Sequence, residues 1–139
     1  MIFSRQQMFS DGQPVTGTTA STHTLDTGAF RTPHRGKALD RDLGKGTPIP
    51  VLAQVVEDFT GLTSVKISVQ CDDDSNFGSP KNVIEETLAL ADLKAGRQAS
   101  FQVLPNHLTG RYIRLYYTTS GTATAGKITA GITLGNQTN

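Results

Sequence analysis

The sequence predicts an all-β protein, an antiparallel β-sandwich of the jelly-roll type with about eight strands. Three observations favour this fold class. Apolar and polar residues alternate over short segments, Val, Ile, Thr, Tyr and Phe dominate these segments, and clusters of Gly, Pro, Asn and Asp separate them. A length of 139 residues suits one domain, so we expect a single jelly-roll domain over residues 1–139. A seven-stranded sandwich is the close alternative.

Residues 1–47 are rich in Thr, Ser, Gly and charged side chains and show little regular alternation. Residues 1–12 carry Phe3, Phe9 and Arg5 ahead of the recognisable strands, which makes this segment a candidate for an extended arm lying across a neighbouring subunit. Residues 15–25 have room for two short strands. Residues 29–47 have no apolar period, so we expect a long loop there.

Residues 48–139 show the denser strand pattern. The expected strands are 49–55, 65–71, 83–88, 99–104, 111–118 and 127–134. A single helical turn is the most that residues 87–95 suggest, because Gly96 stops the pattern. Alternation predicts this core: Val51, Val55, Val65, Ile67, Val69, Phe101, Val103, Ile113, Leu115, Ile128 and Ile132.

The charge balance argues against two classes of partner. The formal net charge of +1 gives no overall field to attract nucleic acid or an anionic membrane, and no apolar run is long enough to span a bilayer. We therefore expect neither as a partner. The opening residues also lack the apolar run of a secretion signal.

No residue type stands at a spacing that predicts catalysis or metal binding. The acidic run 72–76 begins like a calcium loop, but Phe77 replaces the required Gly and Val83 replaces the final Glu, so we expect a turn capped by Asp side chains. The three histidines lie far apart, and no nucleophile motif is present. We expect no cofactor, no metal site, no catalytic residues and no enzymatic activity.

Two surfaces are candidates for protein contacts. The first is a basic loop with Arg31, Arg35, Lys37, Arg41 and Lys45, for which a solvated loop is the alternative. The second is one face of the strand 111–118, which presents Tyr112, Arg114 and Tyr116, residue types enriched at interfaces. An ordinary solvated face with Arg stacked on Tyr explains the second equally well.

Several segments together resemble a family of small cement, or decoration, proteins from tailed phages. They are residues 9–16 (FSDGQPVT), 20–22 (AST), 26–28 (DTG), 41–46 (RDLGKG), 65–70 (VKISVQ), 111–117 (RYIRLYY) and 124–131 (TAGKITAG). Their order and spacing, more than any one of them, carry the resemblance. Two features depart from the family pattern: Pro14 interrupts the first element, and the stretch of residues 30–38 is a basic loop where the family has small residues.

The resemblance implies a jelly-roll subunit that associates with itself as a dimer or trimer. It implies binding to the outside of a phage capsid, between subunits of the major capsid protein, and hence a location in the virion after synthesis in the host cytoplasm. It supplies no catalytic residues. A carbohydrate- or receptor-binding module of a phage particle is the alternative, although the chain lacks Trp, on which sugar sites often rely.

Overall fold

The computed structural model describes residues 2–28, 32–34, 37–39, 46, 48–106 and 108–134. Its main feature is a six-stranded antiparallel sheet with the order β1-β8-β6-β7, in which β2 and β3 also pair with β8. The strands of this sheet are β1 (Phe3–Pro14), β2 (Thr19–Ala20), β3 (Leu25–Asp26), β6 (Val51–Asp72), β7 (Lys81–Ala89) and β8 (Tyr112–Thr133). The prediction of an all-β, antiparallel fold is confirmed.

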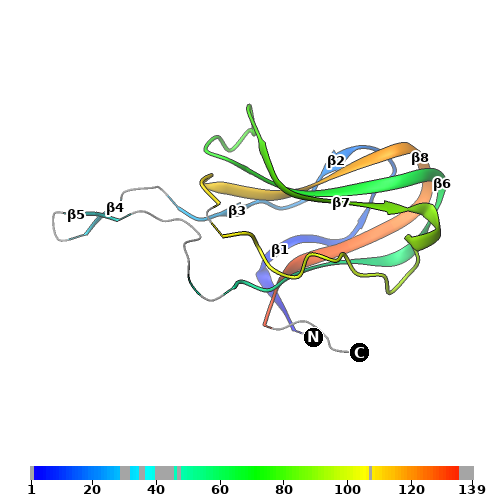
Figure 1. The fold of residues 1–139 in the computed structure, drawn as a ribbon, viewed down its shortest axis with the longest axis horizontal. Coiled ribbons are helices and arrows are strands. Elements are labelled where there is room, and N and C mark those ends of the chain that lie inside the picture. The colour runs from blue at the N-terminus through cyan, green and yellow to red at the C-terminus, as the bar shows by residue number, and fades with distance from the viewer. Residues whose placement is uncertain are drawn as a thin grey trace.

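Two long strands, β6 and β8, form the centre of the sheet and run its whole length. Each has 22 residues, and they pair from Val51↔Ile132 to Asp72↔Tyr112. Four register shifts interrupt this pairing between Val55 and Ser64. Bulges of this kind bend a strand and increase its twist without ending it. Figure 1 shows both strands turning at the end of the molecule where β6 and β8 are labelled, so the sheet folds back into two layers.

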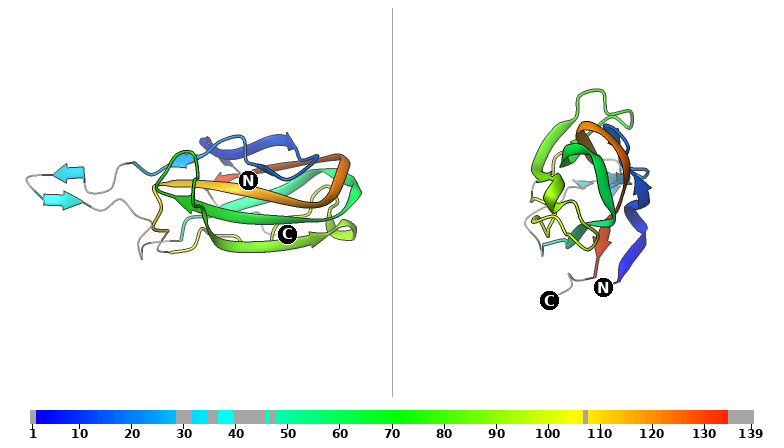
Figure 2. Two further views of the ribbon diagram at one scale, coloured as in Figure 1. Left: turned by 90° about the horizontal axis from the view of Figure 1, so that it is seen from above. Right: turned by 90° about the vertical axis from the view of Figure 1, so that its right-hand side faces the viewer.

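The bend divides the partners of β8 between the two layers. β1 pairs with the C-terminal part of β8, up to Thr133, whereas β2 and β3 pair with its first residues, from Tyr112 to Tyr117. β7 pairs with the second half of β6. The end-on view in Figure 2 shows this curl of the sheet around its interior.

The core lies between the two layers. Of the eleven residues that alternation predicted, nine are buried: Val51, Val55, Val65, Ile67, Val69, Phe101, Ile113, Leu115 and Ile128. Ile132 is partly buried and packs against the core. The prediction for Val103 is wrong, because this side chain is 44% exposed. Phe9, Phe59 and Tyr117 are the largest side chains that complete the core.

The sequence predicts more strands in the second half of the chain than the structure contains. The segments 49–55 and 65–71 belong to one strand, β6, and the segments 111–118 and 127–134 belong to one strand, β8. Residues 99–104 are not a full strand: Pro50↔Val103 and Gln54↔Gln98 are isolated bridges to the start of β6. The expected helical turn is present as η1 (Leu90–Asp92).

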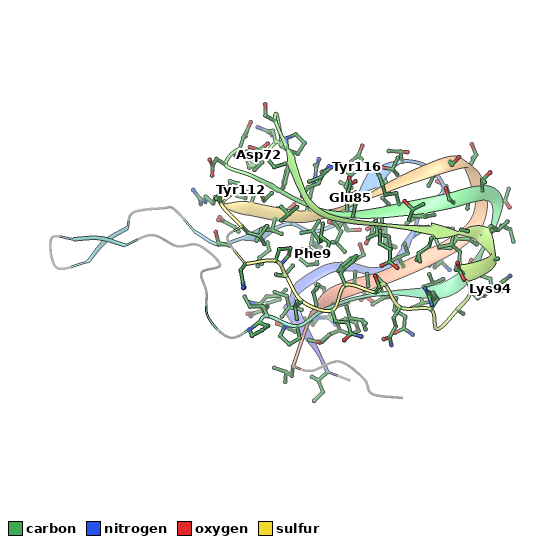
Figure 3. The ribbon with its side chains drawn as sticks, viewed as in Figure 1. Phe9, Asp72, Glu85, Lys94, Tyr112 and Tyr116 are labelled. Carbon is green, nitrogen blue, oxygen red and sulfur yellow. The ribbon has the colours of Figure 1, made fainter. Side chains whose placement is uncertain are left out.

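The expected arm at residues 1–12 is corrected as well. Phe3–Pro14 is strand β1 of the sheet, and the Phe9 side chain is only 1% exposed. Figure 3 shows Phe9 between the layers. A segment that places a Phe in the core belongs to the domain itself, because burying that side chain contributes roughly 1.5–3 kcal/mol.

Part of the expected loop at residues 29–47 is also regular. β4 (Thr32–His34) and β5 (Lys37–Leu39) pair with each other in antiparallel register, from Thr32↔Leu39 to His34↔Lys37. They form a separate two-stranded sheet, which stands apart from the main one in Figure 2. An isolated pair of strands is marginally stable in water.

Candidate functional site

The predicted contact face of β8 lies at the start of that strand. Ile113, Leu115 and Tyr117 point into the core and are fully buried, so Tyr112, Arg114 and Tyr116 lie on the opposite face and are half-exposed. Figure 3 shows Tyr112 and Tyr116 in the same layer as Asp72. We call the surface formed by Tyr112, Arg114, Tyr116 and Phe77 the Arg114 face.

Arg114 is the central residue of this face. Its guanidinium carbon lies 3.9 Å from the centroid of the Phe77 ring and 5.1 Å from that of Tyr116. Its Nε donates a hydrogen bond of 2.9 Å to Oε1 of Gln70. Partial burial lowers the pKa of Arg114, while charge interactions with Tyr116 and Asp72 oppose this shift. The guanidinium remains charged under all ordinary conditions, so the face carries a fixed cation.

A ladder of polar side chains across three strands holds Gln70 in place. Gln70 lies opposite Arg114 on β8 and Asn82 on β7, and its Nε2 donates to Oδ1 of Asn82 at 2.8 Å. Asn82 donates to Oε1 of Glu85 at 2.6 Å, and Lys66 lies 3.2 Å from the same oxygen. Each cross-strand pair restricts its neighbour, so the position of the Arg114 Nε is set by the sheet.

Phe77 reaches Arg114 from the acidic turn that follows β6. Asp72 accepts a hydrogen bond from the backbone N of Asp74 at 3.1 Å, and Asp74 accepts one from the backbone N of Asn76 at 3.0 Å. These contacts confirm the expected Asp-capped turn. The hydrogen bond from Asp74 is also the main reason why the pKa of Asp72 lies below its usual value.

Phe77 itself has an unusual backbone conformation. Its φ of 53° lies in the left-handed region, and no other non-glycine residue in the described part of the chain has a positive φ. The side chain is only 8% exposed, although it lies outside the main core cluster. Sequence reasoning missed Phe77 as a site residue, because only the folded sheet brings the turn beside Arg114.

An ion pair joins Arg111 to Asp26 next to the Arg114 face. Nε and one terminal nitrogen of Arg111 donate to the two carboxylate oxygens of Asp26 at 2.7 Å and 2.8 Å. The Arg111 hydrogen bond lowers the pKa of Asp26 to about 2. The Arg111 guanidinium also lies 4.9 Å from the Tyr112 ring. This pair attaches β3 to β8 and restrains Tyr112.

The candidate contact residues on β1 differ in exposure to solvent. Arg5 is exposed and Phe3 is half-exposed, so both are available to a partner. Phe9 was expected to be a contact residue, but it lies in the core and is not available. Near Phe3, the large apolar side chains of Ile2 and Leu134 are 66% and 79% exposed, and the backbone N of Leu134 donates to the carbonyl of Ile2 at 3.1 Å.

The basic loop cannot be placed on the surface in the same way. Arg31, Arg35, Arg41 and Lys45 lie outside the described residues. Lys37 begins β5, where the structure describes the backbone alone. These five candidates therefore remain predictions from the sequence.

Within the described ranges, no group of three or more His, Cys, Asp or Glu side chains is placed to hold a metal ion. A cavity of about 40 Å³ beside the acidic turn is lined by Cys71, Asp72 and Gly110, among others. Ligand pockets are roughly ten times larger, so this cavity does not suit a small-molecule substrate. None of the described helices is long and apolar enough to cross a membrane.

Comparisons with known proteins give one result that bears on identity. A search of the curated proteins finds no match to this sequence. Residues 9–132 match the protein family Bbp16, from the start of the first buried segment of β1 to the last residues of β8. Since this match covers most of the chain, including the whole Arg114 face, the protein belongs to the Bbp16 family.

Proposed function

We propose that this protein is a structural virion component, a cement protein that binds the outside of a tailed-phage capsid. It binds between subunits of the major capsid protein and stabilises the shell. The observation that carries the proposal is the Arg114 face, where a guanidinium contacts two aromatic rings, those of Phe77 at 3.9 Å and Tyr116 at 5.1 Å. Arg and Tyr in such an arrangement are typical of protein interfaces. The resemblance of the sequence to phage cement proteins supports the same reading.

We propose that the all-β fold is a jelly roll in which β6 and β8 each run through both layers. The two layers joined by β6 and β8 enclose the core, and counting the two halves of each long strand separately would support a sandwich of about eight strands. A closed core leaves the outer faces free to carry contacts. No catalytic group or cofactor enters the proposal.

Binding stabilises a shell through mass action. A subunit that contacts neighbouring capsid proteins binds the assembled shell better than the separated proteins, which shifts the equilibrium toward assembly. Self-association into a dimer or trimer then multiplies the contacts of each attached particle. The exposed side chains of Ile2 and Leu134, beside half-exposed Phe3, support an apolar contact at this end of the subunit.

The basic loop is a second proposed contact. Arg31, Arg35, Lys37, Arg41 and Lys45 are accompanied by only two acidic residues in this stretch, so the loop favours an acidic protein surface. Contacts between exposed charges weaken with salt because mobile ions screen them within roughly 10 Å at 0.1 M. This part of the binding is therefore expected to depend on ionic strength.

The proposal is tested by adding the purified protein to undecorated shells assembled from the major capsid protein of the same phage. Cosedimentation should show saturable binding, and cryo-electron microscopy should show density that matches the sandwich between capsid subunits. The temperature at which the shells disrupt should rise with occupancy. Shells that bind no protein at any concentration, with an unchanged disruption temperature, would contradict the proposal.

A carbohydrate- or receptor-binding module is the second candidate. The half-exposed rings of Tyr112 and Tyr116 on either side of Arg114 favour it, because sugars pack on aromatic rings. A glycan array separates the two functions. Saturable binding to a glycan together with no binding to shells would favour the second candidate.

A further inference from the structure

We propose that Arg114 is the anchor of the Arg114 face and that it binds one carboxylate of a protein partner, an exposed Asp or Glu side chain, through its two terminal nitrogens. This inference rests on the proposed function, since the partner would be the capsid shell. It goes further by naming the chemical group that the face recognises.

The first support is that, among the described residues, an acceptor is present only for the Nε of Arg114. Its Nε donates to Oε1 of Gln70, but no described residue accepts a hydrogen bond from the terminal nitrogens or forms an ion pair with them. Asp72 acts on Arg114 through its charge alone. Arg111, three residues earlier, provides the contrast, because Asp26 binds it with both oxygens. Arg114 is only partly buried, so water reaches these donors in the free protein, and a partner that supplies acceptors would replace this water with direct hydrogen bonds.

The second support is that the guanidinium is held in one orientation before any partner arrives. The Phe77 ring at 3.9 Å and the Tyr116 ring at 5.1 Å restrict its plane, and the Gln70 hydrogen bond restricts its rotation. An arginine fixed in this way loses little entropy when it binds. A planar, oriented fork matches the two oxygens of a carboxylate.

The third support is the backbone of Phe77. A φ of 53° is unfavourable for a residue with a bulky side chain and persists only where surrounding contacts impose it. Here the Asp72 and Asp74 side chains impose it by fixing the turn, and the result is a ring placed under Arg114. Strain of this kind is concentrated at functional sites.

The charges around the face favour a single carboxylate over a polyanion. The turn that holds Phe77 carries Asp72, Asp73 and Asp74, and Glu85 lies further along the polar ladder. These groups would repel a nucleic acid or a highly charged polysaccharide at close range. One Asp or Glu on a protein surface brings a single charge to the fork, and Tyr112 and Tyr116 provide the flanking contact area.

The test compares three variants on the undecorated shells. Arg114→Gln removes the charge, and Arg114→Lys keeps the charge but removes the fork. Arg97→Gln, an exposed arginine in the stretch beside the start of β6, is the matched control. We expect Arg114→Gln to bind roughly 30-fold more weakly or worse, the lower end of the loss when one partner of an interface charge pair is removed. Arg114→Lys should recover only part of this affinity, and Arg97→Gln should bind like the parent.

A second arm changes the shell instead of the protein. Shells whose surface carboxylates have been converted to neutral amides with a carbodiimide and methylamine should bind the parent more weakly. Arg114→Gln should lose much less affinity on the same treated shells. Equal losses for both proteins would overturn the inference.

The remaining outcomes separate this inference from the proposed function. If the parent binds untreated shells and a folded Arg114→Gln binds equally well, the inference is overturned while the proposed function stands. If the parent does not bind shells at all, the proposed function is wrong, and the carboxylate proposal, which rests on it, is overturned with it. If Arg114→Gln weakens binding to a glycan instead of a shell, the face recognises a sugar and the carboxylate proposal is wrong. Thermal melting of each variant shows that it is folded.

Discussion

The hydroxyl of Tyr117 on β8 lies 2.8 Å from the hydroxyl of Ser10 on β1, in a part of the core where both residues are fully buried. Ser10 donates to Oε1 of Gln13 at 2.7 Å, and Gln13 donates to the carbonyl of Ala20 at 2.8 Å. Burial raises the pKa of Tyr117 well above its usual value, so the hydroxyl keeps its proton. This chain of hydrogen bonds ties the edge strand to the centre of the sheet.

The Ser10 hydroxyl is therefore expected to contribute more to stability than that of Tyr117. Ser10→Ala leaves the Tyr117 hydroxyl buried without a partner, which costs about 1–3 kcal/mol of unfolding free energy. Tyr117→Phe should cost only about 1 kcal/mol, because Ser10 still bonds to Gln13. Urea denaturation of both variants measures the difference. A Ser10→Ala protein that is more stable than Tyr117→Phe would contradict the hydrogen-bond chain.

The ion pair between Asp26 and Arg111 predicts a loss of stability in acid. The pKa of Asp26 is lowered from 3.8 to about 2, so the folded protein favours the ionised form. The stabilisation is fully present well above pH 3.8 and is lost as the pH falls toward about 2. Asp26→Asn should melt at a lower temperature than the parent at neutral pH, and this gap should close over that acidic range.

Melting curves between pH 7 and pH 2 provide the measurement for Asp26. Asp11→Asn, which removes an exposed acid on β1, is a control for the general effect of charge. A gap between parent and Asp26→Asn that is constant over the whole range would show that the ion pair contributes nothing to stability.

Gly126 is expected to be indispensable where β8 bends. Its φ is 133°, and a Cβ at this position would overlap the ring of Phe59. Gly126→Ala should cost about 1–3 kcal/mol of unfolding free energy through overpacking, and more from the backbone. Gly17→Ala is the matched control, because a Cβ added at Gly17 would meet no other atom within 4 Å and the φ of this residue is not in the left-handed region. Chemical denaturation should show Gly17→Ala within about 0.5 kcal/mol of the parent.

The acidic turn predicts that stability does not depend on metal ions. Both oxygens of Asp72 already accept backbone hydrogen bonds, from Asp74 at 3.1 Å and from Ser79 at 2.9 Å. Position 12 of a calcium loop would need a bidentate Glu where this chain has Val83. The melting temperature should be the same in EDTA and in millimolar calcium. A drop in EDTA that calcium reverses would mean that the turn binds the ion.

The sequence by itself determined which residues face the core wherever strands are regular. On β8, alternation was enough to place Ile113 and Leu115 inside and Tyr112, Arg114 and Tyr116 outside. The Asp-capped turn at Asp72 was predictable for a similar reason, because its hydrogen bonds join residues two apart. Both signals are local, so they can be read without knowing the partner strands.

Only the tertiary structure decided how the strands are connected and what lies beside Arg114. Gly61 and Gly126 suggest turns in the sequence, yet here they accommodate bends within continuous strands, because pairing between β6 and β8 continues through the bulges. The sparse apolar pattern of residues 1–12 suggested an arm, but pairing with β8 carries Phe9 into the core. Likewise, Phe77 and Arg114 are 37 positions apart in the sequence, and no local pattern can predict that contact.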